Sequence, residues 1–484
     1  MTSEQRVVVI GGGLAGLRLA QRLGAERGPA VTVLGEETHA PYNRVLLAEV
    51  LAGRYPPEVT ALPAPGPVLR RGVRAVRIDR ADRRVHCDDG TAPEYDVLVL
   101  ATGSNPVLPP LRGLFPPDGR ELPDGVHAFR TMDDCLALDA AVRPGVRAVV
   151  IGGGLLGVSA ARALAARGAQ VVLAQQAERL MERQLDADAS ALLHTHLTAL
   201  GVEIHTECRV RGLTTAGDQG PGPGSTPTPG TNSTPHAGTK STPAPGTDST
   251  PRPGTDSAPR SGTGTDPRSG TGSVPVVGPG AAPAHPERRR VTGVELADGY
   301  RLDADLVVLA CGVRPRTGLA RAAGLDVRKG IVVDDRLRTS DPRVHAIGDC
   351  AEHAGRVYGL AGPALEQAET LAALLTGGAG AAPAVTPYAG TRALTRLTLG
   401  RTGPGDGHFD LAAFGEPTAL PGDDVVRLAD ATRRTYRKVV VRGDRLVGGV
   451  LLGELSTVGA LARTWADDES LHDLFHLLTD DGGH

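Results

Sequence analysis

The sequence lacks several features that mark particular classes of protein. Its five cysteines include no C-x-x-C or C-x-x-x-x-C pair, so we expect neither a metal site nor a local redox dithiol. No apolar run approaches the roughly 20 residues of a membrane span, and the N-terminus has no signal-peptide pattern. With 52 basic and 55 acidic residues, the net charge of -3 gives no reason to expect nucleic acid or an anionic membrane as partner. We therefore expect a cytoplasmic protein.

Glycine and proline, at 64 and 38 of the 484 residues, are concentrated in one segment. Residues 214–285 consist largely of Gly, Thr, Ser, Pro and Asp, and contain an octapeptide repeat that begins at Gly230, Gly238, Gly246 and Gly254. Such a tract buries too little apolar surface to offset its ordering entropy, so we predict a disordered insertion. The flanks, up to Val210 and from Arg290, are strand-like, with a further turn at Asp298-Gly299. The tract should therefore replace the turn of a hairpin.

A strand, a glycine-rich turn and a helix follow one another near the N-terminus. Residues 6–10 are apolar, and Gly11, Gly13 and Gly16 come directly after them. A second strand ends at Glu36, 20 residues past the last glycine. Glycines permit a tight turn, close approach to a pyrophosphate and close helix packing, and the acid accepts hydrogen bonds from ribose hydroxyls. This arrangement predicts a dinucleotide site.

A second unit of the same kind contains Gly152, Gly154 and Gly157, 141 residues further along the chain. Two dinucleotide sites in one chain usually hold a flavin and a nicotinamide nucleotide. Here the strand ends at Gln175 in place of an acid. An amide still hydrogen-bonds a ribose hydroxyl, and nearby Arg179 is a candidate partner for a 2′-phosphate, so the choice between NADH and NADPH stays open.

With these two units the sequence resembles the two-dinucleotide flavoprotein reductases of the pyridine nucleotide-disulfide oxidoreductase superfamily. Residues 95–103 resemble the segment that leaves the FAD-binding domain of that group, and residues 310–315 its counterpart in the nucleotide-binding domain. Residues 344–349 resemble the strand whose acid, here Asp349, meets the flavin ribitol. The match covers nearly the whole chain outside the insertion.

Other segments look most like the flavoprotein half of assimilatory nitrite reductase or the electron-transfer subunit of assimilatory nitrate reductase. These segments are residues 40–53, 180–186, 358–363, 395–399 and 439–452.

Four departures from relatives bear on function. Ferredoxin reductases of this type carry a lysine where this chain has Glu49. The family usually has a glutamate facing the nicotinamide where this chain has Ser159, and Gln175 is the second departure at the nucleotide site. No cysteine follows Cys350, so the iron-sulfur and sirohaem modules of nitrite reductase are not expected, and the chain should not reduce nitrite by itself.

The resemblance implies an α/β fold with two doubly wound, Rossmann-like dinucleotide-binding domains, the second inserted in the first, and a small C-terminal α/β domain. The expected boundaries are 1–124 and 313–384 for the FAD-binding domain, 125–312 for the NAD(P)H-binding domain with the insertion at 214–285, and 385–484 for the C-terminal domain.

The resemblance also implies an FAD-dependent oxidoreductase that takes electrons from NADH or NADPH. The acceptor would be a separate protein, either a nitrate or nitrite reductase component, a ferredoxin or a rubredoxin, and a homodimer is left open. The flavin carries the chemistry, so no catalytic side chain is expected. The residues expected to bind FAD are Gly11, Gly13, Gly16, Glu36, Arg44, Thr102, Gly103, Gly348 and Asp349. Those expected to bind NAD(P)H are Gly152, Gly154, Gly157, Gln175 and Gly312.

Two other functions stay open. Ser159 and Gln175 favour a non-enzymatic or redox-sensing FAD protein with an impaired nicotinamide site. A ferredoxin or rubredoxin reductase is the lesser alternative. A disulfide reductase is disfavoured because residues 38–53 contain no cysteine, and a flavin monooxygenase because such enzymes rarely keep the segment 182–186.

Overall fold

The computed structural model describes residues 5–24, 29–63, 68–116, 119–216, 289–377, 386–401 and 409–471. The predicted disordered tract at 214–285 lies outside these residues, apart from Thr214 to Ala216. Among the helices described, none combines the length and the apolar character needed to cross a membrane.

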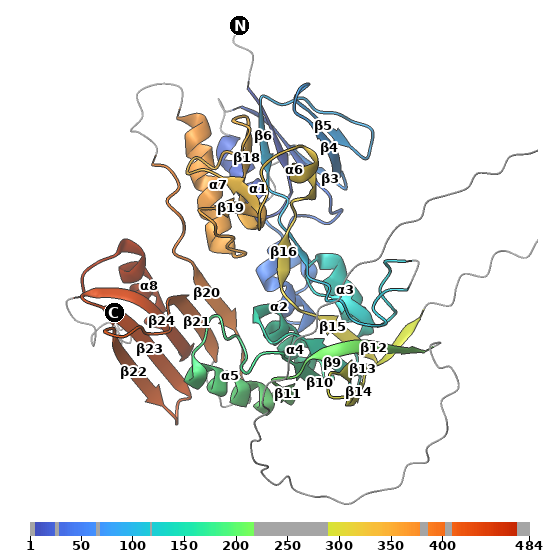
Figure 1. Cartoon of the computed structure of the whole chain (residues 1–484), viewed down its shortest axis with the longest axis vertical. Coiled ribbons are helices and arrows are strands. Elements are labelled where there is room, and N and C mark those ends of the chain that lie inside the picture. Colours follow the sequence, from blue (N-terminus) through green and yellow to red (C-terminus); the bar gives the residue numbers. More distant parts are fainter. Residues whose placement is uncertain are drawn as a thin grey trace, which may run out of the picture. The chain divides into compact units, whose positions relative to one another are not determined.

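The first sheet, of which Figure 1 labels β18, β6 and β3, has five parallel strands in the order β18-β6-β1-β2-β3. Its strands are β1 (Arg6–Ile10), β2 (Ala30–Gly35), β3 (Leu69–Arg71), β6 (Val97–Leu100) and β18 (Val344–Ala346). Helices α1 (Leu14–Leu23) and α7 (Ala361–Thr376) lie side by side, and Glu369 of α7 pairs with Arg18 and Arg22 of α1. The central strands β1 and β6 are apolar throughout or nearly so, as expected for parallel strands covered on both faces.

The second sheet is also parallel, in the order β11-β10-β9-β15-β8. Its strands are β8 (Val126–Ala128), β9 (Arg147–Ile151), β10 (Gln170–Ala174), β11 (Val202–His205) and β15 (Leu306–Leu309), and its helices are α3 (Met132–Ala141), α4 (Leu155–Ala166) and α5 (Ala187–Ala199). All these strands fall in the sequence between β6 and β18 of the first sheet. The predicted fold class, two doubly wound units with the second inserted in the first, is confirmed, while the individual domain boundaries stay predictions.

The two passages of chain between these sheets pair with each other. They form the antiparallel strands β7 (Ser104–Pro106) and β16 (Val313–Pro315), with Asn105 opposite Arg314. The structure also describes the helices α2 (Leu47–Leu51) and α6 (Gly318–Ala322), the strands β4 (Ala75–Asp79), β5 (Arg84–Cys87), β17 (Ile331–Val333) and β19 (Ala351–His353), and the 3-10 helices Arg44–Leu46, Pro57–Thr60 and Gly348–Cys350.

The strands that flank the insertion pair with each other, as predicted for an insertion at a hairpin. Of the predicted flank at 201–210, however, only Val210 belongs to this pairing, because Val202–His205 form β11 of the parallel sheet. Strands β12 (Val210–Ala216), β13 (Arg290–Leu296) and β14 (Arg301–Asp303) form an antiparallel sheet. The sequence prediction placed the start of the tract too early, because Thr214 to Ala216 belong to β12. Thr215 is buried and lies opposite Val291. Pairing with β13 therefore extends the strand into small, polar residues that by their composition resemble the tract.

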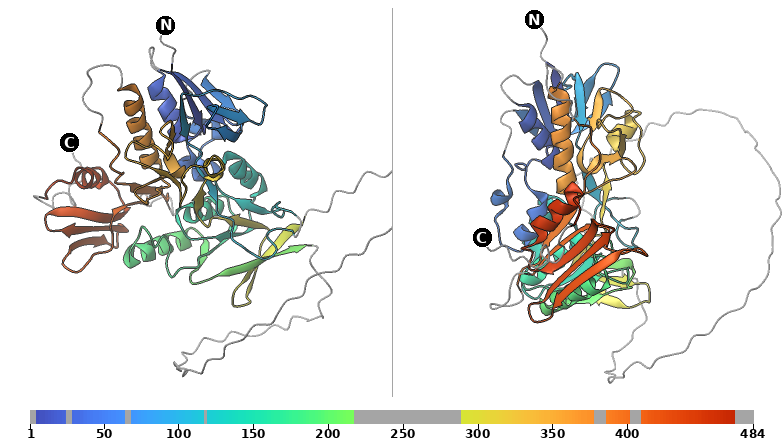
Figure 2. Two further views of the ribbon diagram at one scale, coloured as in Figure 1. Left: turned by 45° about the horizontal axis from the view of Figure 1, so that its top comes forward. Right: turned by 90° about the vertical axis from the view of Figure 1, so that its left-hand side faces the viewer.

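Within the described residues, the C-terminal part is a five-stranded antiparallel sheet with one helix (Figure 2). The strands are β20 (Leu394–Thr398), β21 (Asp410–Gly415), β22 (Asp424–Asp430), β23 (Thr435–Arg442) and β24 (Arg445–Gly453), and the helix is α8 (Val458–Asp467). Trp465 of α8 packs on Phe414 on one side of the sheet. Asp186, which caps α5, accepts hydrogen bonds of 2.8 Å from Tyr436 and Lys438 of β23. Although burial opposes ionisation of Asp186, these hydrogen bonds lower its pKa overall, so a buried ion pair fixes the sheet to α5.

Candidate dinucleotide-binding site

Both glycine-rich turns open into one cavity of about 1840 Å³. Sites for drug-sized ligands take roughly 300–1,000 Å³, so this cavity has room for more than one small ligand. Every residue predicted to bind FAD or NAD(P)H lines it except Gly16 and Gly157. The cavity wall also includes residues that the sequence analysis did not predict, among them Arg130, Arg316 and the start of α7 at Ala361.

Four of the predicted glycines are required by the backbone itself. Gly11 and Gly152 have φ of +125° and +111°, which disfavours any side chain. A Cβ on Gly16 would lie 2.1 Å from the carbonyl oxygen of Gly11, and a Cβ on Gly157 would lie 1.7 Å from that of Gly152. These glycines therefore allow each helix to start directly against its strand, which brings the helix N-terminus to the cavity.

Other glycines leave space that no protein atom fills. A Cβ on Gly13, Gly154, Gly103 or Gly312 would meet nothing within 4 Å, and all four line the cavity. Gly13 and Gly154 are the N-caps of α1 and α4 and have φ values that any residue adopts. Packing within the protein does not require glycine at these two positions, so the space suits the close approach of a ligand. The residues present therefore fit a dinucleotide at each turn.

The helices that begin at the cavity have uncapped N-termini. Helices α1, α4 and α7 have no side-chain cap and no acidic residue in the first turn. Helix α3, by contrast, is capped by Thr131 and α5 by Asp186. Free N–H groups and the positive end of the helix dipole attract phosphate groups, so α1 and α4 present two anion sites to the cavity.

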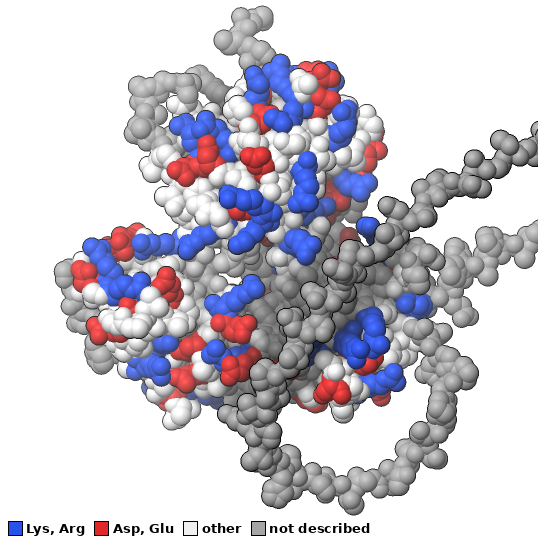
Figure 3. All heavy atoms as spheres, viewed as in Figure 1, with Lys and Arg blue, Asp and Glu red and all other residues white. Residues whose placement is uncertain are grey.

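The charges that line the cavity are mostly positive. Lys and Arg are interspersed with Asp and Glu over most of the surface that Figure 3 shows, and the chain has a net charge of -3. The carboxylates of the lining are those of Glu36, Glu37, Glu182 and Asp349. The cations are Arg44, Arg71, Arg74, Arg130, Arg183, Arg209, Arg316, Lys329 and Arg396. The lining thus has nine cations and four anions, and this excess of positive charge favours ligands with several phosphate charges.

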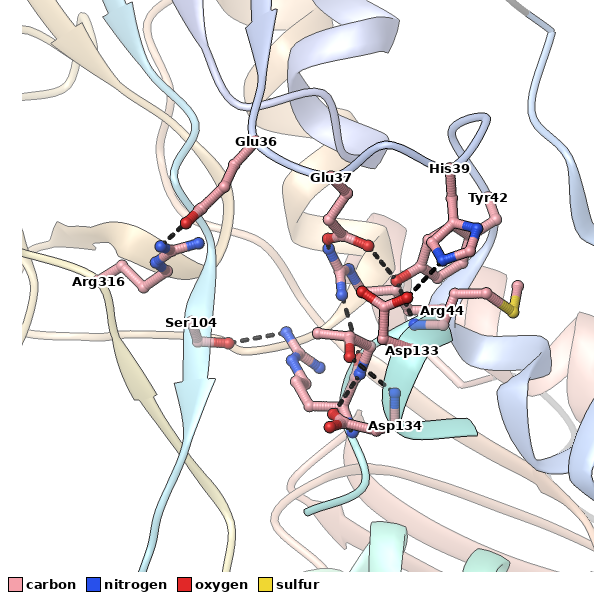
Figure 4. Close-up of polar contacts among 12 residues, drawn as sticks. Glu36, Glu37, His39, Tyr42, Arg44, Ser104, Asp133, Asp134 and Arg316 are labelled. Carbon is pink, nitrogen blue, oxygen red and sulfur yellow. Dashed lines mark hydrogen bonds and ion pairs between the residues drawn. The ribbon is translucent and has the colours of Figure 1, made fainter. Parts of the chain in front are cut away.

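Arg316 brings three of the predicted FAD-binding residues together. Its Nη2 lies 2.6 Å from Oε2 of Glu36, and Figure 4 shows the two side chains meeting across the space between their segments. The backbone N–H of Arg316 donates to the carbonyl oxygen of Gly103 at 2.9 Å, and Thr102 Oγ1 donates to the carbonyl oxygen of Arg316 at 2.8 Å. Glu36 is therefore held at the cavity wall, where binding to a ribose stays a prediction.

Asp349 is held by two polar partners. Arg130 Nη2 lies 2.5 Å from its Oδ2, and Ser104 Oγ donates to the same oxygen at 2.9 Å. The side chains of Arg130 and Asp349 are each only 16% exposed. Next to them, the N–H of Gly348 donates to the side chain of Gln367 at 2.7 Å. Arg130 follows the end of strand β8, and the carboxyl ends of parallel strands are where such sheets bind ligands, so this position offered a signal that the sequence analysis missed.

Arg44 lies at the cavity with its charge already paired. It forms an ion pair with Glu37 and donates to the carbonyl oxygen of Arg130 at 3.0 Å. Its guanidinium lies 5.1 Å from the ring centroid of Tyr42, whose hydroxyl donates to Glu37 at 2.6 Å (Figure 4). Burial raises the pKa of Tyr42, so this hydroxyl keeps its proton. Contact of Arg44 with a flavin or a phosphate stays a prediction.

Gln175 and Ser159, the two residues near the second glycine turn that differ from the family pattern, form hydrogen bonds with nearby backbone groups. The amide of Gln175 accepts a hydrogen bond from the N–H of Gly153 at 2.8 Å and donates to the carbonyl oxygen of Arg179 at 3.2 Å. Ser159 Oγ donates to the carbonyl oxygen of Leu155 within α4, at 2.7 Å. Gln175 thus braces the glycine turn, and Ser159 places a small neutral group at the cavity wall.

Comparison with known families gives two matches. The family described as pyridine nucleotide-disulphide oxidoreductase matches residues 5–227 and 278–368. The rubredoxin NAD+ reductase C-terminal domain matches residues 408–464.

Individual relatives match over nearly the whole chain. Nitrite reductase [NAD(P)H] of Bacillus subtilis (strain 168) is 30% identical over 461 residues, which is 94% of this chain and 46% of the relative. The assimilatory nitrate reductase electron transfer subunit of the same organism is 28% identical over 459 residues, 93% of this chain and 48% of the relative. The chain therefore spans about half the length of these relatives. A ferredoxin reductase for the CYP199A2 system from Rhodopseudomonas palustris shares the fold, with a TM-score of 0.72, 24% identity and coverage of 99% of this chain and 100% of that one.

Proposed function

The chain belongs to the pyridine nucleotide-disulphide oxidoreductase family, and we propose that it passes electrons from NADH or NADPH to a separate acceptor protein in nitrate or nitrite assimilation. Membership confirms the resemblance predicted from the sequence. It makes the protein an oxidoreductase with FAD as cofactor and NAD(P)H as co-substrate. The observation that carries the proposal is the pair of uncapped helix N-termini, at α1 and α4, that open with their glycine turns into one cavity.

The residues at the first turn fit FAD. Gly13 and the N-terminus of α1 would receive its pyrophosphate, and Glu36 would accept from the adenosine ribose. Asp349, held by Arg130, would accept from the ribitol. When bound, FAD supplies the chemistry, because it accepts a hydride from NAD(P)H and releases electrons singly to an acceptor.

The protein would then contribute orientation, electrostatics and exclusion of water. Helix α7 begins at Ala361 on the cavity wall without a side-chain cap, so its positive end would favour negative charge that develops on a bound group during reduction. Leu155, Leu156 and Met181 give the wall beside the second turn an apolar surface, which would limit water where a nicotinamide ring binds.

The acceptor and the cellular role rest on likeness to relatives. The two Bacillus relatives are named for nitrite reduction and for electron transfer in nitrate reduction, which supports a role in assimilation of nitrate or nitrite. All five cysteines are free thiols, which supports the proposal of a location in the reducing cytoplasm.

Reduction of a ferredoxin or a rubredoxin is a second candidate. The match of residues 408–464 to the C-terminal domain of rubredoxin NAD+ reductase favours it. Both candidates share the first half of the reaction and differ only in the acceptor. Side-by-side assays with a nitrate or nitrite reductase component, a ferredoxin and a rubredoxin would separate them.

Anaerobic stopped-flow absorbance at the flavin band tests the first half of the reaction. The FAD-loaded protein is mixed separately with NADH and with NADPH. Reduction of the flavin by either nucleotide within milliseconds to seconds is expected. Absence of reduction by both, with FAD still bound, would favour a non-enzymatic FAD protein whose second site is disabled at Ser159 and Gln175.

A further inference from the structure

We propose that the second dinucleotide site selects NADPH over NADH, through Arg209 and the absence of a carboxylate at the end of β10. This inference rests on the proposed function and specifies its electron donor. The two nucleotides differ only in a phosphate on the 2′-oxygen of the adenosine ribose. Selection must therefore come from the groups that lie beside that ribose, at the end of β10.

The residue that directly follows β10, Gln175, is uncharged. An NADH site usually has an acid here, which accepts from the 2′-hydroxyl and repels a 2′-phosphate. Gln175 carries no charge, and both ends of its amide are bonded to backbone groups of Gly153 and Arg179. The side chain is therefore committed to bracing the turn, and a free 2′-hydroxyl gains no charged acceptor from it.

Arg209 is placed next to this strand end by the backbone. The N–H of Cys208 donates to the carbonyl oxygen of Gln175 at 2.9 Å, and the N–H of Glu207 donates to that of Ala177 at 3.0 Å. The next residue, Arg209, is exposed and lines the cavity. Its guanidinium has neither a hydrogen bond nor an ion pair with the residues that the structure describes. A guanidinium without a partner offers a planar set of donors that matches a phosphate.

A second cation lies close to the same turn. The N–H of Met181 donates to the carbonyl oxygen of Gly153 at 3.0 Å, which fixes the following residues beside the glycine turn. Arg183 of that segment is exposed, lines the cavity and likewise has no partner among the described residues. Between Ala174 and Val210 the lining contains these two arginines and a single carboxylate, that of Glu182. The local charge therefore favours the additional phosphate.

Binding of 2′,5′-ADP and 5′-AMP to the FAD-loaded protein tests the inference without any redox reaction. Bound FAD keeps both probes out of the first site, and the probes differ only in the 2′-phosphate. Calorimetry should show 2′,5′-ADP binding about tenfold or more tightly than 5′-AMP, which is the effect of one hydrogen-bonded charge pair. Equal affinities, or tighter binding of 5′-AMP, would overturn the inference.

Three variants test which residues cause the preference for the 2′-phosphate. Arg209→Gln should remove most of it, while Arg211→Gln should keep it, because Arg211 is exposed on β12 and does not line the cavity. Gln175→Glu should reverse the preference toward 5′-AMP. A preference that survives Arg209→Gln would overturn the role of Arg209.

The test also separates this inference from the proposed function. If the flavin is reduced by NADH and NADPH at equal rates, and the two probes bind equally, the inference fails while the proposed function stands. If neither probe binds and neither nucleotide reduces the flavin, the proposed function fails, and the inference fails with it.

Discussion

Glu36 and Arg316 meet at the cavity wall although they lie 280 residues apart in the sequence, with 2.6 Å between Oε2 and Nη2. Arg316 follows the strand β16 that connects the two sheets, and its backbone is bonded to Thr102 and Gly103. The second carboxylate oxygen of Glu36 has no hydrogen-bond partner among the described residues. The ion pair therefore orients the carboxylate and leaves one oxygen for a ligand.

Replacement of Glu36 by Gln should weaken FAD binding by about tenfold, because the amide keeps an acceptor but loses the charge, and a hydrogen bond to a charged group contributes about 1–1.5 kcal/mol more than a neutral one. Fluorescence titration of the FAD-free protein with FAD measures the dissociation constant. Arg316→Gln is the matched control, since it removes the ion pair and keeps the acceptor, and it should change the constant by less than about threefold. Equal losses in both variants would show that the ion pair, and not a contact with ribose, matters for binding.

Glycines 154 and 157 should respond differently to the same substitution. Gly154→Val adds a side chain whose Cβ would meet no protein atom within 4 Å, so the melting temperature should change little while reduction by NAD(P)H is lost. Gly157→Val places a Cβ 1.7 Å from a carbonyl oxygen and should cost about 3 kcal/mol or more of unfolding free energy. Thermal unfolding and stopped-flow reduction are measured on both. A stable Gly154→Val protein that keeps full activity would mean that the ligand does not approach this turn.

The sequence predicted those parts of the fold that rest on local patterns. Apolar strands, glycine spacing and the helices after them were enough for the two parallel sheets, since backbone constraints at Gly11 and Gly152 are local. The hairpin at the insertion was predicted from its flanks, but the end of β12 was not, because pairing across the hairpin and not composition extends that strand to Ala216.

The parts of the site that were missed depend on contacts between distant segments. The sequence around Arg130 does not predict that its partner is Asp349, which lies 219 residues away. Arg316 and the uncapped start of α7 reach the cavity only because β16 and β18 return to earlier strands. Outside the cavity, the ion pair of Lys438 with Asp186 could not be predicted for the same reason, because Asp186 caps α5 beside the second parallel sheet while Lys438 lies on β23 of the C-terminal sheet.

Glu49 and Arg162 form a buried ion pair between α2 and α4. Removal of only one of the two charges should lower the free energy of unfolding markedly. Arg162 is 2% exposed, and burial lowers its pKa, so Glu49 compensates a charge that has been removed from water. Glu49→Ala should lower the unfolding free energy by about 3–5 kcal/mol, as removal of one member of a buried pair does. Urea denaturation provides the measurement.

The double variant Glu49→Leu with Arg162→Met is the control for this pair. It removes both charges and should recover most of the loss, because apolar residues of similar volume often replace a buried pair at little cost. If the double variant were as unstable as Glu49→Ala, shape and not charge would explain the effect.

Stability should fall in mild acid because of buried His345. Burial lowers its pKa below the ordinary value of 6.5, so the unfolded chain takes up the proton more readily than the folded chain. Its contribution to stability is fully present above pH 6.5 and is lost as the pH falls toward the folded-state pKa. The loss from one such group reaches at most about 1.4 kcal/mol per pH unit.

Melting temperatures measured from about pH 7.5 down to about pH 5.5 check this prediction. His345→Gln should give a flatter profile than the unaltered protein. Some acid sensitivity should remain in that variant, because burial also lowers the pKa of His127. Identical profiles for the two proteins would contradict the assignment to His345.

The pairing of β12 with β13 has a consequence for how the chain can be divided. Ala216 lies opposite Arg290, so the chain leaves and re-enters this sheet at one place. A cut between them would give two fragments, neither with a complete parallel sheet, because β18 and β15 lie in the second fragment and their neighbours β6 and β9 in the first. Each fragment supplies the edge or partner strand that the other lacks. The protein is thus a natural candidate for a split reductase, whose two halves restore both dinucleotide sites only when they associate.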